Sequence, residues 1–455
     1  MNAFPYGFKY APYPERPAYV LSLIGMTSYF LSLNWLGQLR RHRTMLLLVG
    51  AFLFCGLGAT LAGGLRLGGG DLLEFSLLNY LYRKVFPCLY VLWFAFLLST
   101  LEEGARRRFF IGALLVLFIP NAAHMILENL GNFGLTAAKE FLIDINPWLR
   151  TENTSHGSWP PVYYTDRVRG LFAEPSHLAY AFIPLLGFFF HKIHEKLIYL
   201  LPLLLLAFSY FFKIPTLTGI VSLGIFFIAY VLRLFMPVMS RRPGRAAVCL
   251  LALSACALVY FSTLPLGTHL GKEWQQAGHI AAYCKQAQDD PSVAPPQLHI
   301  KNESRIFTRM TALRLETDIA LEHPLGVGFY LSGFYWQPLR IWETQPQEIF
   351  RYVLYAFKKP VPVIPQLCEY SALACELGFP SLILFLALCL YIGGLACKRH
   401  AQDRDTFLFY MIVSLVAFMA ALFSFALKSG FMLYYFLGFL YAISQAANEH
   451  REAGW

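Results

Sequence analysis

Charged residues are scarce in this chain: they make up 14% of its 455 residues, whereas a soluble domain usually contains about 25%. Hydrophobic residues make up 57% of the sequence. Several nearly uncharged runs reach about 20 residues, the length that a helix needs to cross a bilayer. The composition therefore excludes an ordinary soluble protein and predicts a multi-span membrane protein.

Several metal-binding patterns are also missing. The nine cysteines are scattered, mostly in apolar runs, and none forms a Cys-x-x-Cys pair, so zinc and iron–sulfur sites are not expected. Cys368 and Cys375 lie seven residues apart; a disulfide is one interpretation, and packing as inert thiols is the one that we favour. No aspartate-rich motif occurs in the predicted outer segments, which argues against a metal-dependent nucleotide-sugar enzyme. We expect no metal and no other cofactor.

The formal net charge is +10. Much of the positive charge lies in short loops between apolar runs, which is typical of a topology signal and not of a nucleic-acid surface. We therefore expect no nucleic-acid partner. Residues 1–17 are polar and rich in proline, so we expect no cleavable secretory signal there.

The predicted fold class is all-α: a polytopic membrane protein of about eleven transmembrane helices with one long extracytoplasmic loop. We expect three parts, namely an N-terminal transmembrane bundle (1–264), an extracytoplasmic loop containing helices (265–369), and C-terminal transmembrane helices with a cytoplasmic tail (370–455). The spans are predicted near 18–37, 44–65, 85–101, 109–127, 171–190, 197–212, 215–234, 247–264, 372–394, 406–426 and 431–446.

The loops on alternate sides differ in positive charge. One set carries sixteen Lys and Arg residues and the short segments of the other carry eleven, so the first set is predicted to be cytoplasmic. The long segment 265–369 then faces outward. Within it, helical spacing of apolar residues predicts a helix from Ser304 to Ala320. Residues 71–84 are predicted to form an interfacial amphipathic helix.

The stretch from Arg167 to His177 places two arginines, a glutamate and a histidine at the mouth of an apolar helix. Pro175 suits the first turn of that helix. Arg167 and Arg169 would lie near its N-terminus, where anions bind favourably, and guanidinium groups match phosphate oxygens. The alternative is an interfacial pair between an arginine and Glu174 that anchors the end of the helix.

A second group of candidates lies in the outer loop. Arg305 and Arg309 are four residues apart and share a helix face, whereas Arg314 is offset from that face. His323 and Pro324 follow, and then the pair Gly326 and Gly328. This pair is too short for a phosphate-binding loop, because no Lys-Ser/Thr follows it. A solvated cationic helix face remains an alternative interpretation.

Glu369 and Glu376 lie seven residues apart at the start of a predicted span. Carboxylates near a membrane boundary are costly unless they are paired or solvated. Lys213 and Lys428, each at an outer helix end, are candidate partners. The alternative is that the two carboxylates contribute to a binding site.

Three of these patches resemble elements of the bacterial O-antigen polymerase and ligase group, in the same order. The residues from Arg167 to Ser176 are similar to an Arg-x-x-Gly-Leu-Phe-x-Glu-Pro-Ser element. Arg309 followed by His323-Pro324 and the glycine pair resembles a second element, and Glu376-Leu377-Gly378 resembles a late Glu-x-Gly helix start. The segment from Lys213 to Gly219 is weakly similar to a basic element found midway.

This resemblance implies a GT-C-like glycosyltransferase of the bacterial inner membrane whose active site faces the periplasm. Its donor and acceptor would be polyprenyl-diphosphate-linked oligosaccharides, and arginines in place of a metal would stabilise the diphosphate leaving group. Glu174 or His323 would deprotonate or orient the acceptor. A chain-length regulator and a flippase are implied partners. The implied catalytic residues are Arg167, Glu174, Arg309 and His323; the implied substrate- or diphosphate-binding residues are Arg169, His177, Lys213, Arg305, Arg314, Glu369 and Glu376.

Polymerase and ligase are distinguished by the residues before Glu376. Ligases of this group commonly carry a His-Asn element about nine residues earlier, where this chain has Pro365-Gln366-Leu367-Cys368. We therefore favour a polymerase for O-antigen or a related exopolysaccharide over a ligase that transfers glycan to a lipid A–core acceptor. A lipid-linked glycan flippase is an alternative of another class, although no internal repeat typical of transporters is evident.

Overall fold

The structure is a computed structural model of the whole chain. It describes residues 42–99, 101–149, 168–172, 175–211, 216–241, 305–336, 368–422 and 431–445, together with a few single residues between 275 and 290. Regular structure within these residues is entirely helical, without a strand. The prediction of an all-α protein is therefore confirmed for the part of the chain that is described.

Three of the described helices are long and apolar enough to cross a membrane: α3 (Arg43–Arg66), α6 (Glu103–Asn132) and α18 (Glu369–Asp403). Shorter apolar helices cover four further predicted spans, at Ile183–Ile193, Leu197–Phe211, Thr218–Arg233 and Thr406–Ala421. The predicted spans 18–37 and 247–264 lie outside the described residues. Membrane-spanning character is thus supported, and the count of eleven stays a prediction.

Most predicted spans coincide with helices. The remaining described ones are α4 (Asp71–Tyr80), a π-helical turn (Leu81–Val85), α5 (Phe86–Ser99), α7 (Thr136–Leu149), α8 (Pro175–Ala181), α9 (Ile183–Ile193), a 3-10 turn (Leu197–Tyr199), α10 (Leu200–Phe211), α11 (Leu217–Arg241), α14 (Arg305–Glu322), α15 (Gly333–Trp336), α19 (Thr406–Ala421) and α20 (Phe431–Gln445). The sequence did not predict α7. The helix expected over Ser304 to Ala320 is confirmed as α14.

The predicted span 171–190 is not one uninterrupted helix. It begins at Pro175 and breaks at Phe182, and α9 then starts with a proline, Pro184, in its first turn. Proline lacks the N–H that would continue the hydrogen-bond ladder, and its ring clashes with the preceding turn. The same residue is well placed at the start of a new helix. The break therefore follows from Pro184.

The chain divides into two compact units. Unit 1 comprises residues 1–53, 81–226 and 383–455, and unit 2 comprises residues 54–80 and 227–382. Three helices, α3, α11 and α18, contribute residues to both units. The three parts expected from the sequence follow membrane topology and stay a prediction.

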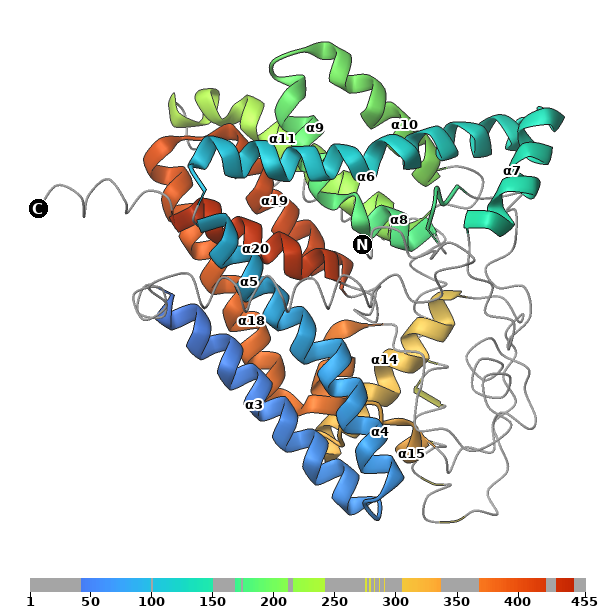
Figure 1. Cartoon of the computed structure of the whole chain (residues 1–455), viewed down its shortest axis with the longest axis vertical. Helices are drawn as coiled ribbons and strands as arrows, with labels where there is room; N and C mark the ends of the chain where they lie inside the picture. The colour runs from blue at the N-terminus through green and yellow to red at the C-terminus, as the bar shows by residue number, and fades with distance from the viewer. Residues whose placement is uncertain are drawn as a thin grey trace, which may run out of the picture. The chain divides into compact units, whose positions relative to one another are not determined.

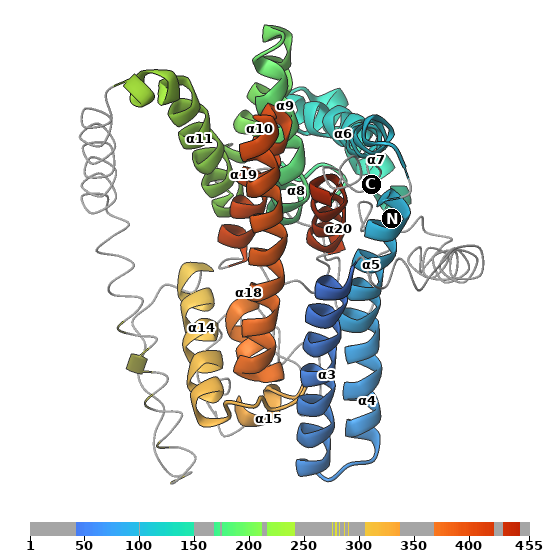
Figure 2. The same ribbon diagram turned by 90° about the vertical axis from the view of Figure 1, so that its left-hand side faces the viewer.

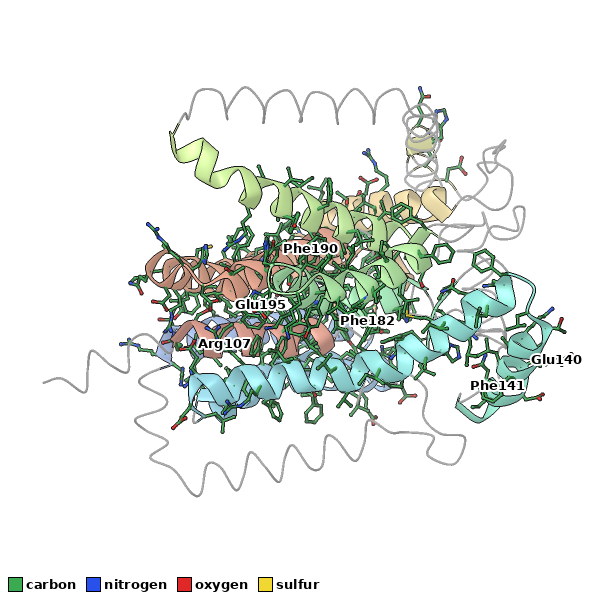
Figure 3. All side chains as sticks on the ribbon, turned by 90° about the horizontal axis from the view of Figure 1, so that it is seen from above. Arg107, Glu140, Phe141, Phe182, Phe190 and Glu195 are labelled. Atoms are coloured by element: carbon green, nitrogen blue, oxygen red, sulfur yellow. The ribbon has the colours of Figure 1, made fainter. Side chains whose placement is uncertain are left out.

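Unit 1 is built around two helix pairs: α20 packs along α5, and α19 packs on α9, while α6 contacts α7, α9, α10 and α20 (Figure 1). Aromatic rings fill the contacts. Phe110 stacks on Phe439 with centroids 3.5 Å apart. Phe182 and Phe190 lie in the interior of the unit, whereas Glu140 and Phe141 project from α7 into solvent or lipid (Figure 3).

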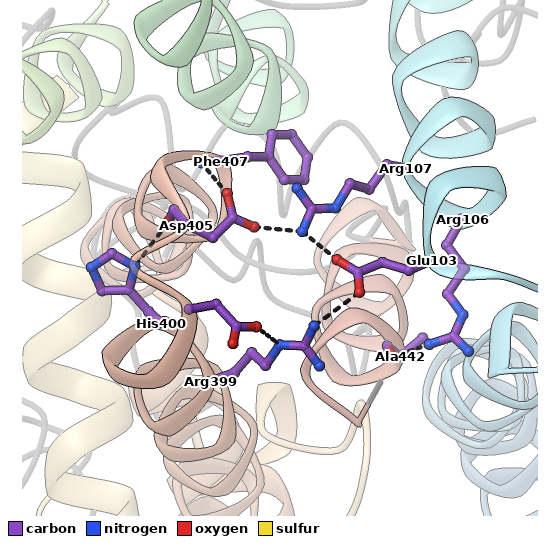
Figure 4. A network of polar contacts seen from close by, with 9 residues as sticks. Glu103, Arg106, Arg107, Arg399, His400, Asp405, Phe407 and Ala442 are labelled. Carbon is purple, nitrogen blue, oxygen red and sulfur yellow. Dashed lines mark hydrogen bonds and ion pairs between the residues drawn. The ribbon is translucent and has the colours of Figure 1, made fainter. Parts of the chain in front are cut away.

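An ion-pair network joins the N-terminal end of α6 to the end of α18 and the start of α19 (Figure 4). Arg107 bridges Glu103 and Asp405, and Arg399 bridges Glu103 and Asp403. The Asp405 side chain also caps α19 by accepting a hydrogen bond from the backbone N–H at position 407. These residues belong to the loops predicted to be cytoplasmic, so the network fixes that end of unit 1.

Unlike its neighbour Arg107, which binds carboxylates, Arg106 binds backbone carbonyls. Its side chain is 1% exposed and donates to three backbone carbonyls, those of Leu101 at 2.6 Å, Ala442 at 2.9 Å and Ser99 at 3.1 Å. The guanidinium group therefore closes the chain reversal between α5 and α6 and ties it to α20.

Unit 2 holds α4, α14 and α15 together with parts of α3, α11 and α18. Figure 2 shows α14 running beside the first part of α18, and a buried hydrogen bond from the Ser371 hydroxyl to the Glu316 carboxylate joins the two helices. On the other side, the Ser76 hydroxyl of α4 donates to the Phe329 carbonyl at 2.6 Å. The first bond thus ties α14 to α18, and the second ties the segment after α14 to α4.

Candidate functional site

Helix α14 carries all three arginines of the outer-loop candidates. It begins at Arg305 and includes Arg309, so the two residues lie one turn apart on one helix face as predicted. Their side chains lie outside the described part of the structure. Arg314 is half-exposed, and its Nε atom lies 3.6 Å from the Asp318 carboxylate. This ion pair within the helix partly neutralises the charge of Arg314.

The segment after α14 interlocks with the start of α18. Three backbone hydrogen bonds of 2.9 Å join them: Val327 N–H donates to the Cys375 carbonyl, Gly328 N–H to the Glu376 carbonyl, and Phe379 N–H to the Pro324 carbonyl. The two segments are thus joined by backbone contacts at the place where α18 departs from helical geometry, at Gly378. The second and third patches of the sequence form one structural element.

Glycine is required at this contact. Gly326 and Gly378 have φ angles of +88° and +83°, a region that other residues rarely occupy. A Cβ atom on Gly326 would come 2.6 Å from the Glu376 carbonyl oxygen, and one on Gly378 would come 2.5 Å from the Leu325 carbonyl carbon. Gly326 and Gly378 therefore allow the close approach of the two backbone segments.

His323 stands at the edge of this element. It follows the last residue of α14, and its backbone N–H donates to the Ile319 carbonyl at 2.8 Å. Its ring lies edge-on to the ring of Tyr335, with centroids 4.8 Å apart. The ring is partly exposed, so it is accessible to a ligand while its backbone is fixed.

Three carboxylates are buried in unit 2. Glu369 and Glu376 are 1% and 2% exposed, and Glu316 of α14 is 1% exposed. The Ser332 hydroxyl donates to Glu376 Oε1 at 3.0 Å, and the Ser371 hydroxyl donates to Glu316. The proposed partners Lys213 and Lys428 lie outside the described residues. At least two of these carboxylates thus tie α14 and its following segment to α18.

Glu316 was not predicted from the sequence, although a signal was present. Leu313 and Ile319 are apolar residues of the predicted helix, and Glu316 lies three residues from each of them. A carboxylate on the apolar face of a helix requires a buried partner, which Ser371 supplies. Cys368 and Cys375, next to this contact, are buried free thiols, as the favoured interpretation predicted.

In unit 1, Arg169 is fully buried, with 0% exposure. Its backbone N–H and that of Gly170 donate to Glu128 Oε2 at 3.0 and 2.8 Å, and its Nε atom lies 3.7 Å from Glu128 Oε1. Arg169 thus pairs with Glu128 of α6, a contact that was not predicted from the sequence. Arg167 and Glu174 lie outside the described residues.

More polar side chains of unit 1 surround this pair. His124 Nδ1 lies 3.4 Å from Glu128 Oε2, and His124 Nε2 is hydrogen-bonded to the Asn146 side chain of α7 at 2.8 Å. The Leu171 N–H donates to Asn121 Oδ1 at 2.9 Å. All three side chains are at most 5% exposed. They were not predicted from the sequence, although His124 and Glu128 are four residues apart at the end of the predicted span 109–127 and so share one helix face.

The last predicted site residue of unit 1 is His177, which lies in α8 and is half-buried. The helix starts at Pro175 as predicted. Among the described residues of the whole chain, no group of three His, Cys, Asp or Glu side chains has the arrangement of a metal site.

A comparison with protein-family models gives no match, and a search of curated proteins finds no significant relative.

Proposed function

We propose that this protein polymerises polyprenyl-diphosphate-linked oligosaccharide repeat units at the outer face of a bacterial inner membrane. The product would be O-antigen or a related exopolysaccharide. The proposal rests on the order and character of the three sequence patches, and on how the described parts of these patches fold. The membrane-spanning helices are consistent with a lipid-linked substrate.

The observation that carries the proposal is the interlock between residues 324–328 and the start of α18. Two patches nearly fifty residues apart, which the resemblance treats as parts of one site, are joined by three backbone hydrogen bonds within unit 2. The joint lies directly after α14, which carries Arg305 and Arg309, and beside the partly exposed ring of His323. A rigid scaffold of this kind suits a site that must hold reacting groups in place.

The chemistry needs charge stabilisation and a base. The acceptor hydroxyl attacks the anomeric carbon of the donor, the bond to the diphosphate breaks, and the leaving group gains negative charge. Arg309 and Arg167 would bind that charge, because a guanidinium group donates two parallel hydrogen bonds to phosphate oxygens. His323 or Glu174 would take the proton of the acceptor hydroxyl.

The test is the length of surface glycan in cells that carry Arg309→Ala, Arg309→Lys or Arg167→Ala. We expect long chains to disappear while single repeat units still reach the surface. Arg309→Lys should restore little, because lysine cannot form the paired hydrogen bonds. Arg108→Ala, an exposed arginine at the start of α6, is the matched control and should leave chain length unchanged.

Other outcomes contradict the proposal. If no units are exported, the protein acts as a flippase. If full-length chains form but are not transferred to a lipid A–type acceptor, it acts as a ligase.

A further inference from the structure

Glu128 is the best-connected buried carboxylate of unit 1. It lies in α6, one of the three helices long enough to cross a membrane, and it is 1% exposed. A charge at such a place is expensive, and intramembrane ionisable groups usually have a function. The same carboxylate contacts two backbone amides, one guanidinium group and one imidazole ring.

The two amides form a small anion-binding site within the chain. The N–H groups of Arg169 and Gly170 are consecutive and converge on a single oxygen, Glu128 Oε2. Consecutive N–H groups that point the same way create a concave site for an anion. Gly170 has a φ of +60°, and a Cβ atom there would come 2.8 Å from Asn121 Oδ1. Glycine is therefore needed for the turn that the carboxylate stabilises.

The second oxygen of Glu128 faces Arg169. Its distance of 3.7 Å from the Nε atom, together with the complete burial of the arginine, sets the guanidinium group against the carboxylate. Two opposite charges buried next to one another offset much of the cost of each, whereas removal of one leaves the other uncompensated. The pair thus fixes the place where the chain enters the turn before α8.

We propose that Glu128 is a positioning residue: its carboxylate sets the course of the chain at Arg169 and Gly170, which follow Arg167 of the proposed site in the sequence. Arg169 then serves to hold this segment and not to bind the diphosphate. The link to catalysis rests on the proposed function, whereas the structural half of the proposal stands without it.

Hydrogen–deuterium exchange of the purified protein tests the structural half. Hydrogen bonds to a charged acceptor contribute about 1.5–3 kcal/mol, so Glu128→Gln should make the amides of Arg169 and Gly170 exchange roughly ten-fold to a hundred-fold faster. Glu140→Gln replaces an exposed glutamate of α7 and should leave them unchanged. Wild-type protection in Glu128→Gln would overturn the proposal, whatever the activity of the protein.

A double variant guards against loss of folding. Glu128→Gln with Arg169→Gln removes both buried charges together, and it should be more stable than either single variant. The same exchange experiment on this double variant should still show faster exchange at Gly170, because the charged acceptor is gone. Protection equal to the wild type would again overturn the proposal.

The catalytic half is tested by turnover of a synthetic polyprenyl-diphosphate repeat unit, normalised to monodisperse folded protein. We expect kcat to fall about ten-fold in Glu128→Gln, with little change in KM, because the loosened segment follows Arg167, which in the proposed function acts on charge that develops in the transition state. If exchange increases while kcat is unchanged, the link to catalysis is wrong. If the wild type itself has no turnover, the proposed function fails and the exchange result still decides the role of Glu128.

Discussion

Gly63→Ala should destabilise unit 2, although alanine is a better helix former than glycine. Gly63 lies in α3, and a Cβ atom there would come 2.0 Å from the Val327 carbonyl oxygen and 2.8 Å from Gly328 Cα. A carbon atom and a carbonyl oxygen rarely approach closer than about 3.3 Å. Both neighbours are backbone atoms, so the helix and the interlocked segment would have to separate by about 1 Å.

The magnitude follows from three contributions. Overpacking of this kind costs about 1–3 kcal/mol. The separation also weakens the buried hydrogen bond from Ser76 to the Phe329 carbonyl, which contributes about 1 kcal/mol. Alanine regains about 1 kcal/mol through its higher helix propensity. The net loss is therefore about 2 kcal/mol.

The assay is thermal unfolding of the purified protein in detergent, followed by intrinsic fluorescence. The control is Gly58→Ala in the same helix, where a new Cβ atom would have no neighbour within 4 Å. We expect a lower Tm for Gly63→Ala and an equal or higher Tm for Gly58→Ala. If Gly63→Ala unfolds at or above the wild-type temperature, the close contact between α3 and the 327–328 segment does not exist.

Two further predictions concern the stability and orientation of the helices. Arg106→Lys should lower the free energy of unfolding by about 2–3 kcal/mol, because one ammonium group cannot reach three divergent carbonyls. The control Arg108→Lys, at an exposed position, should change it by less than about 0.5 kcal/mol. Equal Tm values for the two variants would contradict the role of Arg106 in holding these carbonyls. Orientation can be tested with a membrane-impermeant maleimide. A variant that retains only Cys397, an exposed thiol near the end of α18, should react only in inverted vesicles, and a variant that retains only Cys284 should react only in intact spheroplasts. The reverse pattern would show that the predicted topology is inverted.

Apolar pattern was sufficient to locate most helices in the described residues. The predicted helix over Ser304 to Ala320 matches α14, and Pro175 begins α8 as expected. These features depend on local rules: the spacing of apolar residues and the fixed φ of proline. The break at Phe182 follows the same rules, because Pro184 interrupts the hydrogen-bond ladder. It was not predicted because the residues around it are apolar, so mean hydropathy stays high across the break.

The partners of the charged groups could not be predicted in the same way. The sequence offered Glu174 as a partner for one of the two arginines, and it gave no indication that Arg169 meets Glu128, 41 residues earlier. A buried charge selects its partner from whatever the fold brings near it, and that choice is tertiary. The sequence could show only that His124 and Glu128 share a helix face at the end of a predicted span, which does not identify their contacts.

The contact between residues 324–328 and the start of α18 also changes how the second and third sequence patches are interpreted. Gly326, Gly378 and the Glu376 carbonyl meet through backbone contacts, so the glycine pair and the Glu-x-Gly helix start occur together for a structural reason. Glu376 supports this arrangement through its hydrogen bond from Ser332 and is 2% exposed. The two patches therefore act as one structural element. The proposed glycan transfer depends on this element together with Arg309 and His323, which precede it in the chain, and on the Arg167 stretch.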